Sequence, residues 1–111
     1  MNPIIANLQK LLHGPRDGAL LRFSIGSEYL KAGDPEKAAE YLRGAIEKDA
    51  KYSAAWKLLG KALAEAGRLN EAIETYRKGQ AVAQERGDRQ AAREMSVFAR
   101  RVEKQLGASG G

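Results

Sequence analysis

Apolar residues recur at intervals of three and four along most of the chain, and turn-forming residues interrupt them at regular points. Alternating apolar and polar runs bounded by turn pairs, which would predict strands, do not occur. The spacing therefore predicts an all-α protein. Six helices are expected, over residues 3–13, 18–32, 35–49, 53–66, 71–85 and 88–106.

Short polar residues and glycines mark the ends of the expected helices. Gly33 and Gly67 each follow a helix, and glycine at this position readily takes the left-handed conformation that ends one. The side chains expected to cap helix N-termini belong to Asn2, Asp17, Asp34 and Asn70. His13 is expected at the end of the first helix, where a cationic side chain suits the helix dipole.

The two central helix pairs repeat one another. A shift of 34 residues superimposes Gly26 on Gly60, Ala32 on Ala66, Gly33 on Gly67, Ala38 on Ala72, Glu40 on Glu74 and Arg43 on Arg77. This period is typical of a helix-turn-helix solenoid. A glycine inside a helix costs up to about 1 kcal/mol relative to alanine. We therefore expect Gly26 and Gly60 at close crossings, each meeting the alanine of the second helix in its unit.

These residues resemble the tetratricopeptide repeat family. Residues 53–86 contain Trp56-x-x-Leu59-Gly60-x-x-Leu63, followed by Ala72 and Tyr76, which fits the family's pattern. Residues 19–52 fit it less fully, with Arg22 where the tryptophan is usual, and the second unit has Gly79 in place of the usual alanine. The resemblance implies a right-handed antiparallel helix-turn-helix array, and the chain is similar in general look to small stand-alone bacterial members of the family.

The repeats divide one domain into five segments. Two units are fewer than the roughly three that a solenoid needs, so the extra helices at both ends are expected to close the stack. The expected segments are an N-terminal helix and linker (1–18), a first unit (19–52), a second unit (53–86), a C-terminal capping helix (87–106) and a disordered tail (107–111).

Composition narrows the chemistry that the chain can perform. It has no cysteine and one histidine, which excludes disulfides, thiolate metal sites and multi-histidine metal sites. Phosphate-binding loops, nucleophile elbows and zinc-protease helices are missing from the sequence. Nor is there an apolar run long enough for a membrane helix. We expect a cytoplasmic protein that is not an enzyme and needs no cofactor or metal.

The resemblance implies that the first helix of each unit lines a concave face. Lys57 and Lys61 lie one turn apart on that face. They could hold a carboxylate of a partner while an apolar group packs against Phe23. We therefore expect a scaffold that binds a peptide or helix of another protein, with acidic groups favoured. The expected contact residues are Phe23, Ser27, Leu30, Lys31, Lys57 and Lys61.

Two other functions stay open. Residues 77–111 contain eight basic and four acidic side chains of a chain whose net charge is +5. An alternative basic surface could contact nucleic acid weakly, although no aromatic side chains suited to base stacking are interleaved with it. This surface consists of Arg89, Arg93, Arg100 and Lys104. Self-association is the other alternative, because the sequence does not decide whether the helix over 3–13 covers its own chain or leaves the groove open.

Overall fold

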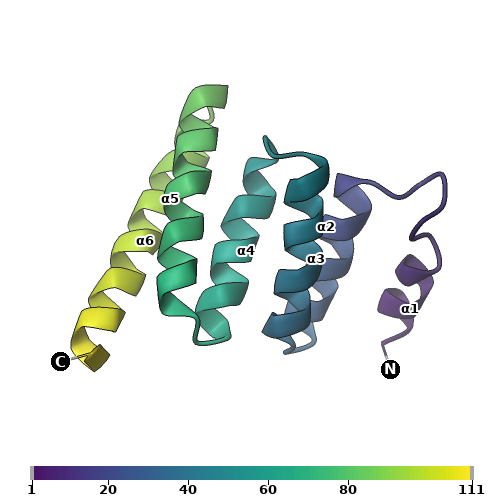
Figure 1. Ribbon diagram of the computed structural model, residues 1–111, viewed down its shortest axis with the longest axis horizontal. Coiled ribbons are helices and arrows are strands. Elements are labelled where there is room, and N and C mark those ends of the chain that lie inside the picture. The colour runs from purple at the N-terminus through teal and green to yellow at the C-terminus, as the bar shows by residue number, and fades with distance from the viewer. Residues whose placement is uncertain (1, 111) are drawn as a thin grey trace.

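The computed structural model describes residues 2–110, with side chains through residue 108, and in this range it contains helices and no strand. The all-α prediction is confirmed. The helices form an antiparallel row in which each packs against its neighbour in sequence (Figure 1). They are α1 (Pro3–Gln9), α2 (Ala19–Lys31), α3 (Pro35–Lys48), α4 (Ser53–Glu65), α5 (Leu69–Arg86) and α6 (Arg89–Gly110).

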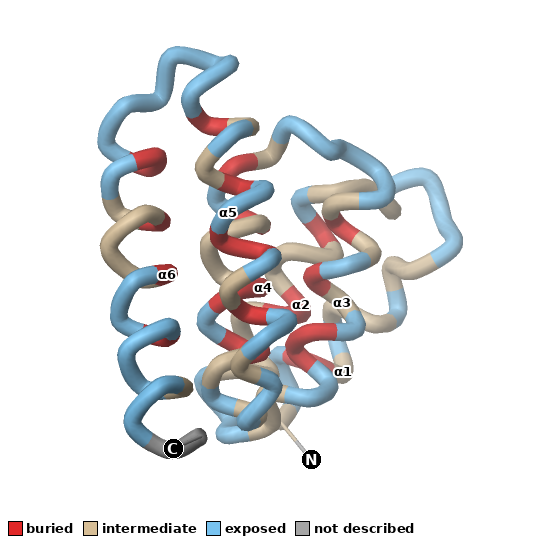
Figure 2. Tube along the Cα trace, turned by 60° about the vertical axis from the view of Figure 1, so that its left-hand side comes forward, coloured by how far each residue is buried: buried red, intermediate tan, exposed pale blue. Residues whose placement is uncertain are grey.

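The row has two sides. Helix α4 contacts both α2 and α6 along one side, and α2 lies behind α3 in the view of Figure 1. The molecule measures 44 × 32 × 18 Å, and the two ends of the chain lie at opposite ends of the row. Buried positions face the interior of the row, so α6 turns one stripe toward α5 and the rest of its surface outward (Figure 2).

Several predicted helix ends are confirmed. The Asn2 side chain accepts a hydrogen bond from the Ile4 N–H at 2.8 Å, and Asp34 accepts one from the Lys37 N–H at 3.1 Å. Gly33 and Gly67 have φ angles of +82° and +81°, the left-handed conformation expected of them. The turns of both repeats are thus set by local chemistry that the sequence displays.

Two predicted caps are wrong. Helix α2 begins after Gly18, and the Asp17 carboxylate instead accepts hydrogen bonds from the His13 N–H and the Arg22 guanidinium. Helix α5 has Arg68 at its N-cap position, so Asn70 lies inside its first turn. Neither α2 nor α5 has a side-chain hydrogen bond at its N-cap position.

The two ends of the chain also differ from expectation. Helix α1 stops at Gln9, and His13 has a φ of +66° in the turns that follow, so His13 does not cap a helix. At the other end α6 continues to Gly110, whereas residues 107–111 were expected to be disordered. No proline or left-handed glycine follows Leu106 among the described residues to stop the helix. Residue 111 lies outside the described range.

Helix α1 packs against its own chain. Ile5 is 3% exposed, and the Gln9 side-chain amide donates hydrogen bonds to the hydroxyls of Tyr29 and Tyr41 at 3.0 and 3.2 Å. These tyrosines belong to α2 and α3, so α1 covers the N-terminal end of the row (Figure 1). It therefore leaves open the face formed by α2, α4 and α6.

The mid-helix glycines do lie at close crossings. A Cβ on Gly26 would stand 2.7 Å from Leu42 Cγ, and one on Gly60 would overlap the Tyr76 ring. The sequence suggested that Ala72 would meet Gly60. The side chain that fills this crossing is instead Tyr76. A Cβ on Gly79 would likewise collide with Met95 of α6 and with Trp56. The departure from the repeat pattern at Gly79 thus gives α6 room to approach α5.

Candidate functional site

A groove of about 630 Å³ lies where α2, α4 and α6 meet. Helix α4 forms its middle, with side chains from α2 and α6 on either side and a tyrosine from α5 between them. Its lining residues are Phe23, Ala54, Lys57, Leu58, Lys61, Tyr76, Glu94 and Phe98. The groove therefore combines aromatic and aliphatic groups with three charged side chains.

Half of the predicted contact residues line this groove. Phe23, Lys57 and Lys61 are brought together there. The other three, all farther along α2, are not in the lining. Leu30 packs against the hydrophobic core, and Lys31 pairs with Glu28 at 3.2 Å. Ser27 is half-buried outside the groove.

Aromatic pairs fix the apolar part of the groove. The rings of Phe23 and Tyr52 have centroids 5.0 Å apart, and those of Tyr76 and Phe98 are 5.6 Å apart. Burial, with a smaller effect from the nearby Glu65 carboxylate, raises the pKa of Tyr76 to about 12. The Tyr76 hydroxyl is therefore uncharged at neutral pH, and the groove has a rigid apolar base.

The two groove lysines differ in their surroundings. Lys57 Nζ lies 3.3 Å from Glu94 Oε1 of α6, with the two side chains 35% and 38% exposed. Lys61 is exposed and has no ion-pair partner among the described residues. Within one turn of α4, Lys57 is thus already paired with Glu94, whereas Lys61 is available to a carboxylate of a partner.

Sequence reasoning missed the contribution of α6. Glu94 and Phe98 belong to a helix that was expected to be an end cap or a basic surface but not part of the groove, although α6 extends the side of the row formed by α2 and α4. The order of the helices could have predicted this contribution, because the helix that follows two complete units occupies the place of the first helix of a third unit. Phe98 is half-buried and lines the groove.

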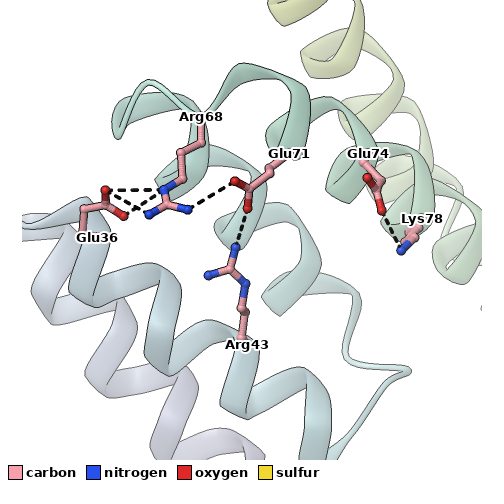
Figure 3. A network of polar contacts seen from close by, with 6 residues as sticks. All are labelled: Glu36, Arg43, Arg68, Glu71, Glu74 and Lys78. Atoms are coloured by element: carbon pink, nitrogen blue, oxygen red, sulfur yellow. Dashed lines mark hydrogen bonds and ion pairs between the residues drawn. The ribbon is translucent and has the colours of Figure 1, made fainter.

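Several charged side chains on the other side of the row form ion pairs with one another. Arg68 contacts Glu36 at 3.0 Å and Glu71 at 3.2 Å (Figure 3). Arg43 binds the same Glu71 at 2.8 Å, and Lys78 pairs with Glu74 at 2.9 Å. A hollow of about 440 Å³ on this side is bordered by several of these residues. The paired charges leave it without the available cation that the groove has in Lys61.

The sequence pattern of the tetratricopeptide repeat family matches residues 23–88, more than half of the chain. The chain belongs to this family. A protein of Pseudomonas aeruginosa named as a TPR repeat-containing protein is 50% identical over 101 residues, covering 91% of this chain and 96% of its own. Tetratricopeptide repeats generally mediate protein–protein interaction and are generally non-catalytic scaffolds.

Solved structures share the fold of this tetratricopeptide repeat protein over most of its length. The solution structure of protein BPP2914 from Bordetella parapertussis has a TM-score of 0.81 and 38% identity, covering 96% of this chain and 92% of its own. A tetratricopeptide repeat domain protein from Salinibacter ruber has a TM-score of 0.73 and 27% identity, covering 83% and 92%. The likeness extends beyond the two repeats to most of the chain.

The basic residues predicted as an alternative surface lie on α6 of this repeat protein. Arg89, Arg93, Arg100 and Lys104 are all exposed. Arg101, which is next to them in sequence, has its guanidinium carbon 5.8 Å from the centre of the Phe98 ring. Arg101 therefore lies at the edge between this surface and the groove.

The described residues hold neither a metal-binding cluster nor a membrane-spanning helix. They contain no group of three or more histidine, cysteine, aspartate or glutamate side chains placed to hold a metal ion. None of the helices that the structure describes is both long and apolar enough to cross a membrane.

Proposed function

We propose that this protein is a non-catalytic interaction module whose groove between α2, α4 and α6 binds an acidic peptide or helix of a partner protein. The observation that supports it is the position of Lys61, an exposed cation without an ion-pair partner in the described chain, at the edge of an apolar groove. A partner carboxylate on Lys61 would place neighbouring apolar groups over Phe23, Leu58 and Phe98.

Apolar contact and charge would contribute differently to binding. Burial of apolar surface contributes about 25 cal/mol per Å², so a large apolar side chain between Phe23 and Phe98 would provide most of the affinity. An exposed ion pair contributes only about 0–1 kcal/mol. The lysines therefore select which apolar segments bind, because a segment with basic residues at the same place would be repelled.

Glu94 makes Lys61 the better lysine to test. Reversing Lys57 would set a carboxylate against Glu94 and disturb the contact between α4 and α6 as well as the groove. Reversing Lys61 changes the charge of the groove without breaking an ion pair within the described residues. Lys37 provides the matched control, because it is an exposed lysine of α3 outside the groove lining.

The test begins with a library of random dodecapeptides displayed on phage and selected on the immobilised wild-type protein. We expect the selected peptides to combine aspartate or glutamate with a large apolar residue. In fluorescence anisotropy, Lys61→Glu is expected to weaken their binding at least fivefold, whereas Lys37→Glu stays within about twofold of wild type. Circular dichroism should show equal helicity in all three proteins.

Three results would contradict the proposed function. The first is a selection that enriches no peptide, and the second is one that enriches peptides without acidic residues. The third is equal binding of the selected peptides to wild type and Lys61→Glu. Glu94→Gln adds a further check, because it frees Lys57 and should raise affinity for the same peptides if their carboxylates reach this lysine.

A further inference from the structure

The outward surface of α6 is basic along its length. Both glutamates of α6 are held by other helices, since Glu94 pairs with Lys57 and Glu103 pairs with Arg77 at 3.0 Å. Five exposed cations of α6 have no ion-pair partner in the described part of the chain, and one of them, Arg101, lies over the Phe98 ring. We call the other four the α6 stripe, and they are Arg89, Arg93, Arg100 and Lys104.

The stripe is straight and lies on one face of the helix. Its members are separated by four, seven and four residues. At 3.6 residues per turn, these spacings place all four within about 60° around the helix, and at 1.5 Å per residue the stripe is about 22 Å long. The buried residues of α6, which include Met95 and Ala99, lie on the other side of the helix (Figure 2).

The position of α6 leaves this face open to a further helix. Helices α2 to α5 each lie between neighbours in the row, whereas α6 contacts α5 and α4 and no other helix that the structure describes (Figure 1). Val97 lies half-buried between Arg93 and Arg100 in sequence and offers a small apolar contact beside the cations. A helix that packed here would extend the row by one element.

We infer that the α6 stripe binds an acidic α-helix of a partner protein, whose carboxylates repeat with the same spacing of four, seven and four residues. Such a helix would lie alongside α6 and pair one carboxylate with each cation. Two other occupants fit less well. A second copy of this stripe would be repelled by like charge, and nucleic acid would find no free ring for base stacking, because Arg101 lies over Phe98.

Two synthetic peptides test the inference directly. Both are alanine-rich helices of 20 residues with four glutamates and one leucine. One has the glutamates at the spacing of the stripe, and the other has them every fifth residue, which spreads them around the helix. In ¹⁵N NMR titrations at low salt, the matched peptide is expected to bind at least fivefold more tightly than the spread peptide, with shifts concentrated in residues 89–104.

Variants locate the binding surface. Arg93→Glu/Arg100→Glu should weaken binding of the matched peptide at least tenfold, whereas Lys10→Glu/Lys37→Glu, which changes the net charge by the same amount at the other end of the row, should stay within about threefold. Lys61→Glu should leave this binding unchanged, which separates the stripe from the groove. Raising the salt concentration should weaken the matched complex.

Several outcomes would overturn the inference. Equal binding of the two peptides would show a general attraction for polyanions. Tighter binding of a mixed-sequence 20-base-pair DNA duplex than of the matched peptide would identify a nucleic-acid surface. Concentration-dependent self-association that Arg93→Glu/Arg100→Glu abolishes would identify a second copy as the occupant. The absence of any shift at 1 mM matched peptide would show that the stripe is only a solvated face.

Discussion

Arg22 shows how a single side chain joins the first repeat to the segment before it. It stands 34 residues before Trp56, so the first unit has a cation where the second has the family's aromatic residue. Its guanidinium binds both oxygens of Asp17, at 3.0 and 2.8 Å, and a Cβ on Gly44 would come 3.1 Å from Arg22 Cδ. Arg22 thus occupies the position of the aromatic residue and binds Asp17 in the turn that follows α1.

This contact makes the turn sensitive to acid. The Arg22 guanidinium and the His13 N–H hold the pKa of Asp17 well below its ordinary value of 3.8. A carboxylate with a lowered pKa stabilises the fold fully above that ordinary value and loses its contribution as the pH falls through the lower folded value. We expect Asp17→Asn to lower the Tm at pH 7 by a few degrees. This difference should narrow below about pH 3.8.

Thermal melts of wild type and Asp17→Asn between pH 2 and pH 7 measure this effect. Glu40→Gln is the control, since Glu40 is exposed on α3 and its removal should shift the Tm little at any pH. A difference between wild type and Asp17→Asn that persists unchanged at pH 2 would show that the carboxylate contributes through packing and not through its charge.

At the scale of helices, glycines decide how closely neighbours approach. Gly60 lies under the ring of Tyr76, so the crossing of α4 and α5 and the base of the groove depend on the same pair of residues. Replacing Gly60 with leucine should overpack this crossing and lower the free energy of unfolding by about 1–3 kcal/mol. Urea denaturation followed by circular dichroism measures the change.

Gly107→Leu is the matched control for the crossing. Gly107 is also a helical glycine, but a Cβ there would meet nothing within 4 Å. Its replacement should be neutral or stabilise slightly, because leucine favours the helix more than glycine does. If both substitutions had the same effect, helix propensity and not crowding against Tyr76 would explain the loss at Gly60.

The sequence predicted the helices better than it predicted the residues that line the groove. Helix bounds follow from local signals, such as the Asn2 cap and the left-handed Gly33, so most were found to within a few residues. The Asp17 cap failed because this carboxylate accepts hydrogen bonds from Arg22 and the His13 N–H, and the Asn70 cap failed because α5 begins at Leu69, two residues earlier than expected. Glu94 was missed as a groove residue because only the packing of α6 beside α4 gives it a role.

For the whole molecule, the terminal helices pack against the two ends of the row that the repeats form. They do so differently. Helix α1 covers one end with Ile5 and Gln9, while α6 supplies a wall of the groove and turns its cations outward. The groove and the α6 stripe therefore lie on different faces of one helix, so that the protein could hold two partners at once.

The contribution of α1 to this row can be measured by removing residues 1–12, which leaves the pair of Asp17 and Arg22 in place. Loss of Ile5 and the neighbouring apolar side chains should lower the free energy of unfolding by about 2–4 kcal/mol, from the transfer of one or two buried aliphatic groups to water. The shortened chain should still unfold in one cooperative transition, because the remaining helices keep their neighbours in the row.

Ile4→Ala is the control for this truncation. Ile4 is 53% exposed, so its replacement should change the free energy of unfolding by no more than about 0.5 kcal/mol. Unchanged stability after removal of residues 1–12 would mean that α1 is not part of the cooperative core. Complete loss of structure would mean that α1 is essential to the fold and not only a cover for one end. A partial loss that includes α2 would remove Phe23 from the groove, so peptide binding there should weaken even with α4 to α6 intact.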